Sequence, residues 1–223
     1  MVNNAPSVYN APSVYNSAGG GVLPPNPGYI EIGGYNFPIT RIGNKFWLAQ
    51  NLDFYDSDFV LNSAQIDGDQ PQINYFDNDE NIYGKNGLKL GALYNYKAVE
   101  LIVQKNILPS GWRVPNESDF LDLQNQLQIS LLNPDDLYND PQPNYSIWTP
   151  RSNVVGFSAI PSGLFNNNYL FKSDYLFMWT QTKYDEMSNV IYRLSYEQGI
   201  NIFAPSNAFI DRQYSIRLCA DVV

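Results

Sequence analysis

The 223-residue chain contains no histidine and a single cysteine, Cys219. Without histidine it lacks the usual general base of enzymes and the commonest ligand of transition metals. One cysteine can form neither an intrachain disulfide nor a cysteine-based zinc site. We therefore expect no enzymatic activity, no metal and no cofactor, and a fold that depends on packing alone.

Positive charge and long apolar runs are also scarce. Thirteen Lys and Arg residues against twenty-two Asp and Glu residues give a net charge of -9, which repels phosphate backbones and anionic membrane surfaces. No segment approaches the roughly 20 apolar residues of a membrane span, and the first thirty residues carry no charge with which a Sec signal would begin. We expect no nucleic-acid partner, no membrane insertion and, for the chain as written, no Sec-dependent export.

The N-terminal segment contains a tandem repeat: Ala-Pro-Ser-Val-Tyr-Asn at residues 5–10 recurs at residues 11–16. Its prolines disfavour helix and its Val-Tyr pairs favour extended chain. Glycines and a stiff proline-rich spacer follow the repeat. We interpret residues 1–28 as an extended attachment arm, with a disordered tail as the alternative. The apolar anchors of the arm are Val8, Tyr9, Val14 and Tyr15.

From Tyr29 onward the sequence changes to short alternating runs separated by turns, which predicts β-strands. Helical spacing near residues 94–105 and 117–128 predicts two helices, the second with Asn116 as its N-cap. No second break in composition appears, so we expect residues 29–223 to form one α+β domain. Strands are expected near residues 29–32, 37–42, 156–160, 177–182, 190–196 and 214–220.

Six segments identify a family. They are residues 42–52 (Ile-Gly-Asn-Lys-Phe-Trp-Leu-Ala-Gln-Asn-Leu), 91–96 (Gly-Ala-Leu-Tyr-Asn-Tyr), 109–115 (Pro-Ser-Gly-Trp-Arg-Val-Pro), 153–163 (Asn-Val-Val-Gly-Phe-Ser-Ala-Ile-Pro-Ser-Gly), 178–182 (Met-Trp-Thr-Gln-Thr) and 215–219 (Ser-Ile-Arg-Leu-Cys). In these segments and their order, the chain resembles the Fibrobacter succinogenes major paralogous domain family, which is abundant in surface proteins of Bacteroidota. The resemblance implies a C-type-lectin-like mixed fold, related to that of the sulfatase-modifying factors.

The tryptophans of these segments point to structure rather than catalysis. Trp47, Trp112 and Trp179 lie in strand or turn contexts near glycines, so we expect them in the core. The sulfatase-modifying relatives are oxidases that depend on reactive cysteines, which this chain lacks. The resemblance therefore implies the fold without the activity.

Two arginines of the same segments, Arg113 and Arg217, are expected to form buried or half-buried ion pairs. Glu117 and Asp119 are the candidate partners. We expect these pairs to hold the fold together.

Residues 77–81 (Asp-Asn-Asp-Glu-Asn) have the alternating oxygens of a calcium loop. However, Ile82 stands where an EF-hand needs glycine, and Leu88 stands where it needs glutamate. We interpret this segment as a solvated turn and predict no metal.

The arm and the family together favour a structural virion protein of a tailed bacteriophage. We expect a head fibre or decoration protein on the capsid surface, attached through its arm to the major capsid protein or another virion protein. Cyclic trimers are usual for such proteins, so a homotrimer is expected. The alternative is a secreted or surface-exposed bacterial glycan-binding, adhesin-like protein that has lost its leader.

The loop between Gly163 and Met178 is the candidate for binding host surface polysaccharide. Aromatic rings stack on the apolar faces of sugars, and amides bind the hydroxyls. The candidate residues are Asn166, Asn167, Asn168, Tyr169, Phe171 and Tyr175. Alternatively, Leu170, Phe171 and Leu176 pack inward and the three asparagines only form a turn.

Overall fold

The computed structural model describes residues 28–81, 89–129, 156–171, 174–197 and 200–222, so the predicted arm lies outside the described residues. Two α-helices, α1 (Tyr96–Gln104) and α2 (Glu117–Ile129), and a 3-10 helix, η1 (Phe76–Asn78), are present. The strands are β1 (Tyr29–Ile32), β2 (Tyr35–Ile42), β3 (Lys45–Leu48), β4 (Val60–Leu61), β5 (Gln72–Asn74), β6 (Leu93–Tyr94), β7 (Trp112–Arg113), β8 (Leu164–Phe165), β9 (Tyr169–Leu170), β10 (Tyr175–Lys183), β11 (Ser188–Glu197), β12 (Ile200–Phe209) and β13 (Cys219–Asp221).

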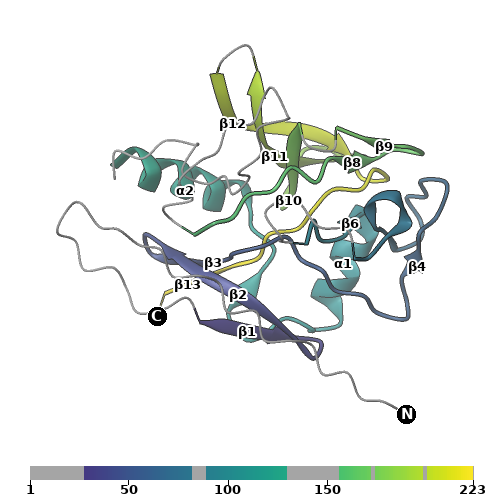
Figure 1. The fold of residues 1–223 in the computed structure, drawn as a ribbon, viewed down its shortest axis with the longest axis horizontal. Helices are drawn as coiled ribbons and strands as arrows, with labels where there is room; N and C mark the ends of the chain where they lie inside the picture. Colours follow the sequence, from purple (N-terminus) through teal and green to yellow (C-terminus); the bar gives the residue numbers. More distant parts are fainter. Residues whose placement is uncertain (1–27, 82–88, 130–155, 172–173, 198–199, 223) are drawn as a thin grey trace.

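The described part of the chain is mainly β, so the predicted α+β class is wrong. Its strands form four small sheets, ordered β1-β2-β3-β13-β7, β10-β11-β12, β4-β5-β6 and β8-β9. Figure 1 shows the β1–β2 hairpin along the lower side of the molecule and β8 to β12 along the upper side, with α1 and α2 at opposite flanks. The two helices are those predicted: α1 packs against β5 and β6, and α2 packs against β10 and β11.

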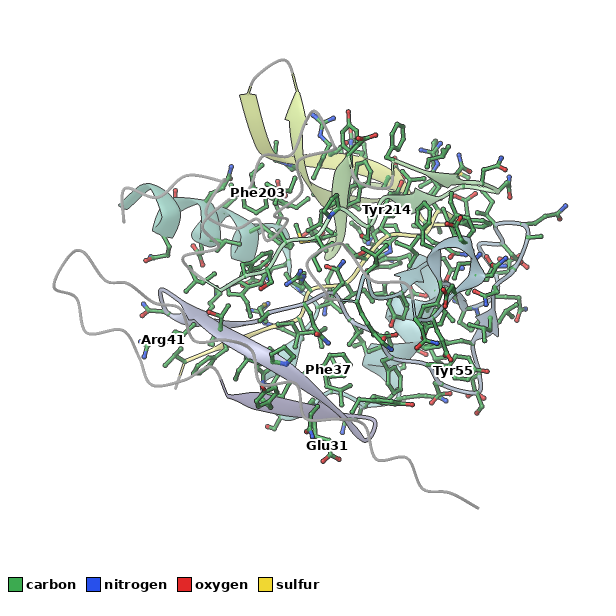
Figure 2. The ribbon with its side chains drawn as sticks, in the orientation of Figure 1. Glu31, Phe37, Arg41, Tyr55, Phe203 and Tyr214 are labelled. Atoms are coloured by element: carbon green, nitrogen blue, oxygen red, sulfur yellow. The ribbon has the colours of Figure 1, made fainter. Side chains whose placement is uncertain are left out.

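The first hairpin forms where its sequence predicts. Gly33 and Gly34 both have positive φ (57° and 85°), a conformation that glycine adopts without steric cost. A Cβ on Gly33 would stand 2.1 Å from the ring of Phe54, so this position also needs glycine for space. In Figure 2, Glu31 points away from the molecule and Phe37 points into it, which is the alternation expected of a half-buried strand.

Both helices begin at asparagine caps. The side chain of Asn95 accepts a hydrogen bond from the Ala98 amide at the start of α1. At the start of α2, Asn116 Oδ1 accepts from the Asp119 amide, and Asp119 Oδ2 accepts from the Asn116 amide. This reciprocal pair is a capping box and confirms the predicted N-cap. Neither helix is long and apolar enough to cross a bilayer.

Two apolar clusters make up most of the core, and each contains a tryptophan. Trp179 is buried in the cluster beneath α1, where its ring packs edge-on against Tyr96 and Tyr214. Trp47 is buried in the cluster between β3, α2 and the β10–β12 sheet, where it contacts Phe120 at 5.2 Å. The core positions predicted for these tryptophans are confirmed. Trp112 is half-buried and packs against the first cluster.

A buried arginine, Arg217, joins three distant segments. Its Nε donates to Asn51 Oδ1 (2.8 Å), Nη1 donates to the carbonyls of Leu48 (2.9 Å) and Phe157 (2.5 Å), and Nη2 donates to the Ser158 carbonyl (2.7 Å). The guanidinium also stacks on the Phe157 ring at 4.6 Å. Burial lowers its pKa to about 9, so the group is still charged at neutral pH. Among the described residues its acceptors are carbonyls and an amide, not the predicted carboxylate.

These bonds explain why one predicted strand is absent. Around residues 156–160 the backbone is irregular, with Gly156 and Ser158 at positive φ (68° and 53°). The carbonyls of Phe157 and Ser158 point to Arg217 instead of a neighbouring strand. Since buried carbonyls need a donor, the guanidinium replaces the ladder that the pattern predicted.

We predict that Arg217→Lys lowers the free energy of unfolding by about 3 kcal/mol or more, because an ammonium cannot reproduce the forked geometry and leaves buried acceptors without a donor. Urea denaturation measures the loss. Arg41→Lys is the matched control, since Arg41 is exposed and its Nε makes one bond to the Gly43 carbonyl; we expect a change within about 0.5 kcal/mol. Equal stability of the Arg217 variant and the native chain would contradict the prediction.

Candidate functional site

The six predicted glycan-binding residues fall into separate groups in the structure. Tyr169 turns toward the molecule: its hydroxyl donates to Asn78 Oδ1 at 2.8 Å, and its ring packs against Phe76 and Phe165 at 4.7 and 4.9 Å. Burial raises the pKa of this hydroxyl. Tyr169 therefore fastens the β8–β9 hairpin to η1.

The three asparagines form the turn of that hairpin. The Asn166 amide donates to the Asn168 carbonyl at 3.0 Å, and Asn167 has a φ of 58°. The side chain of Asn167 accepts from the Ile66 amide at 2.8 Å, which ties the hairpin to the 62–71 loop. Asn167 and Asn168 are exposed, and Asn166 is half-buried.

The second group is formed by Phe171, directly after β9, and Tyr175, the first residue of β10. Their rings meet edge to face at 5.1 Å, and Tyr175 lies parallel to Phe177 at 5.3 Å. The Phe171 side chain is 47% exposed, so it does not pack inward as the alternative interpretation expected. The Arg193 guanidinium lies 6.0 Å from the Tyr175 ring centre.

Phe171 also has an unusual backbone, with a φ of 60°. This left-handed conformation is uncommon for a bulky residue and costs of order 1 kcal/mol or more. A sequence pattern gives no sign of it. Residues with such backbones gather at binding sites more often than elsewhere, which directs attention to the Phe171–Tyr175 pair.

Residues 77–81, the segment for which we predicted a solvated turn and no metal, form a turn in the structure. Asp77 and Asn78 both have positive φ (55° and 58°), and Asp79 Oδ1 accepts from the Asn81 amide at 2.9 Å. Across the described ranges, no three acidic or cysteine side chains are grouped as a metal would require.

A linked cluster of charged residues surrounds Asp119 at the start of α2. Arg113 donates to Asp119 from both Nη1 and Nη2, and Lys45 Nζ lies 3.0 Å from Asp119 Oδ1 and 2.7 Å from Asp221 Oδ1. The predicted Arg113–Asp119 pair is thus confirmed. The cluster fixes β13 between β3 and β7, because Asp221 belongs to β13.

Cys219 is buried beside this cluster, and its Sγ accepts from Arg113 Nη1 at 3.2 Å. Burial raises the pKa of the thiol to about 12, so it remains protonated at neutral pH. A protonated buried thiol is a poor nucleophile, and Cys219 has a packing role here.

One surface depression was not anticipated from the sequence. It lies where α1 meets the end of β10 and is lined by Tyr96, Val99, Glu100, Val103, Gln104 and Gln181. These residues come from segments about eighty positions apart, so no local motif could have signalled it. The anchors of the predicted arm, Val8, Tyr9, Val14 and Tyr15, lie outside the described residues.

The geometry defines a mainly β module whose charged groups join its own segments, with the exposed Phe171 packed against the half-buried Tyr175 on the upper side. The family model described as the Fibrobacter succinogenes major domain matches residues 40–219, and the chain belongs to this family. Neither the curated proteins nor the solved structures include a significant match to the chain.

We predict that Asp119→Asn lowers the free energy of unfolding by about 3 kcal/mol at pH 7, because it breaks a buried pair and leaves Arg113 and Lys45 without their shared carboxylate. Asp119 is 2% exposed at its side chain. Asp122→Asn is the control: Asp122 is 60% exposed and 3.7 Å from Lys45, so we expect less than about 1 kcal/mol. Urea denaturation of both variants distinguishes the cluster from general charge removal.

The same pair predicts a pH dependence. Burial alone would raise the pKa of Asp119, but bonds from Arg113, the Asn116 amide and Lys45 outweigh it and hold the pKa below its ordinary value. A carboxylate with a depressed folded pKa stabilises the fold above its unfolded pKa of about 3.9, and this stability is lost as pH falls through the folded pKa. As pH falls below about 4, the native chain should therefore lose stability more steeply than Asp119→Asn. Parallel curves for the two proteins would contradict this role.

Proposed function

We propose that the protein is a structural virion protein of a tailed bacteriophage, a head fibre or decoration protein that displays its family domain on the capsid surface. The observation that carries the proposal is that β1 and the Phe171–Tyr175 pair lie on opposite sides of the module. The described chain begins at β1 on the lower side, and the exposed Phe171 follows β9 on the upper side, where it contacts the half-buried Tyr175 at the start of β10 (Figure 1). A module attached through its N-terminus at β1 would present the aromatic pair away from the attachment.

The point where the arm joins the domain is firmly held, which suits a tether. The Gly28 carbonyl accepts from the Ile39 amide at 3.0 Å, so the first described residue is already bonded to β2. Force or motion in the arm would therefore reach the five-stranded sheet directly, and not the upper side. The charged cluster around Asp119 secures the same sheet through β13.

The proposed partner of the arm is the major capsid protein or another virion protein. Each repeat offers a Val-Tyr pair, and extended segments with apolar anchors bind by adding to a sheet edge or lying in a groove. Burying one such side chain contributes about 1.5–3 kcal/mol. Two repeats in tandem provide four anchors within twelve residues.

We predict that replacing Val8, Tyr9, Val14 and Tyr15 by serine lowers the amount of protein incorporated into particles at least tenfold, as measured by quantitative immunoblotting of purified virions. The thermal melt of the free protein should stay unchanged. The change removes the anchors and keeps the length of the arm. Replacing Ser7 and Ser13 by alanine in the same repeats is the control and should leave incorporation intact. Normal incorporation of the four-serine variant would overturn the attachment role.

We also propose that the protein is a homotrimer, by analogy with cyclic capsid-attached proteins. Light scattering of the purified full chain should give three times the 25.3 kDa of one protomer. A monomer in solution, together with single copies on the particle in a cryo-EM reconstruction, would contradict it.

The exposed aromatic pair also fits a second function, that of a bacterial surface protein that binds glycans. The two functions differ in where the protein is found. Immunogold labelling of particles favours the virion protein, and labelling confined to bacterial envelopes favours the surface protein.

A further inference from the structure

The upper side presents a small, fixed aromatic surface formed by Phe171 and Tyr175. Behind it, Tyr175 stacks on Phe177, and Phe177 packs edge-on against Tyr214 at 5.6 Å. Phe177 and Tyr214 belong to the main core cluster. The rings are therefore held in place before any ligand arrives, which lowers the entropy lost on binding.

The size of this surface argues against a protein partner. Covering a large aromatic side chain buries at most about 150–250 Å², and Phe171 is the more exposed ring of the pair. A stable protein interface needs about 800 Å² on each partner. The Phe171 and Tyr175 rings, which meet at an angle, present instead an apolar area of the size of a single sugar ring.

The net charge of -9 selects among sugars. A polyanionic polysaccharide would be repelled by the protein as a whole, whereas a neutral one is not. We propose that Phe171 and Tyr175 bind the pyranose rings of a neutral polysaccharide by stacking, without a metal ion, and that Tyr169 takes no part. This inference rests on the proposed display function, because many copies on one particle would convert weak single contacts into firm attachment.

The backbone at Phe171 supplies a clean variant. Asparagine tolerates a φ near 60° better than other non-glycine residues, so Phe171→Asn removes the ring and preserves the turn. Phe171→Tyr retains a ring of similar size. Tyr184→Ala is the matched control, since Tyr184 is 63% exposed on the turn after β10 and belongs to no part of the proposed surface.

The test is affinity electrophoresis of the full chain in gels containing dextran, mannan or xylan as neutral probes and polygalacturonate as the anionic probe, with and without EDTA. We expect retardation by at least one neutral probe, unchanged by EDTA. Phe171→Asn should weaken this binding about tenfold, with Phe171→Tyr and Tyr184→Ala close to the native protein. Thermal melts of all variants should coincide with the native melt.

Four results would overturn the inference: no retardation by any neutral probe, retardation by polygalacturonate alone, loss of retardation in EDTA, or equal retardation of the native protein and Phe171→Asn. Incorporation into particles is scored separately on the same variants. A Phe171→Asn protein that enters particles normally but has lost glycan binding supports both proposals. Glycan binding by a protein that never enters particles would contradict the display function and leave this site standing.

Discussion

The structure depends on satisfying one buried positive charge. Arg217 is fully buried and donates to carbonyls and an amide from two other parts of the chain, residues 48–51 and residues 157–158. A buried charge is costly unless every donor finds an acceptor. The backbone of both segments must therefore adopt whatever path brings its carbonyls to the guanidinium, and regular pairing gives way to that requirement.

The same principle extends outward through buried amides. Asn51 accepts from Arg217 and donates to the Leu90 carbonyl at 2.7 Å, so the arginine is linked to the segment before β6. Asn95 accepts from the amides of Ala98 and Gln72 and donates to the carbonyls of Asp67 and Gln70. One side chain thus caps α1 and closes the 62–71 loop. Segments far apart along the sequence are thus joined by buried polar side chains, one group around Arg217 and another around Asn95.

These buried polar contacts explain which parts of the fold the sequence predicts and which parts it does not. Helices, caps and the strands of hairpins follow from local periodicity and from Asn116, because their bonds join nearby residues. The irregular segments depend on distant partners such as Arg217, which is about sixty residues from Phe157. A pattern within a short stretch of sequence cannot indicate such partners. The α+β prediction failed for this reason. Loops that are held by side-chain hydrogen bonds leave no pattern in the sequence, so the sequence did not indicate that several small sheets make up most of the fold. At the candidate site, alternation places Tyr169 and Phe171 on one face, but the left-handed backbone of Phe171 breaks that alternation.

The charged cluster around Asp119 and the exposed aromatic surface at Phe171 lie in different parts of the module. Arg113 and Lys45 both bond to Asp119 beside β13, so a change in any of the three disturbs the five-stranded sheet. Phe171 takes no part in that cluster, because its ring contacts are with Tyr175 and Phe177. Substitution of Phe171 is therefore expected to change the exposed aromatic surface at little cost to the fold. The charged cluster and the aromatic surface lie in separate parts of the module, so each can vary without disturbing the other.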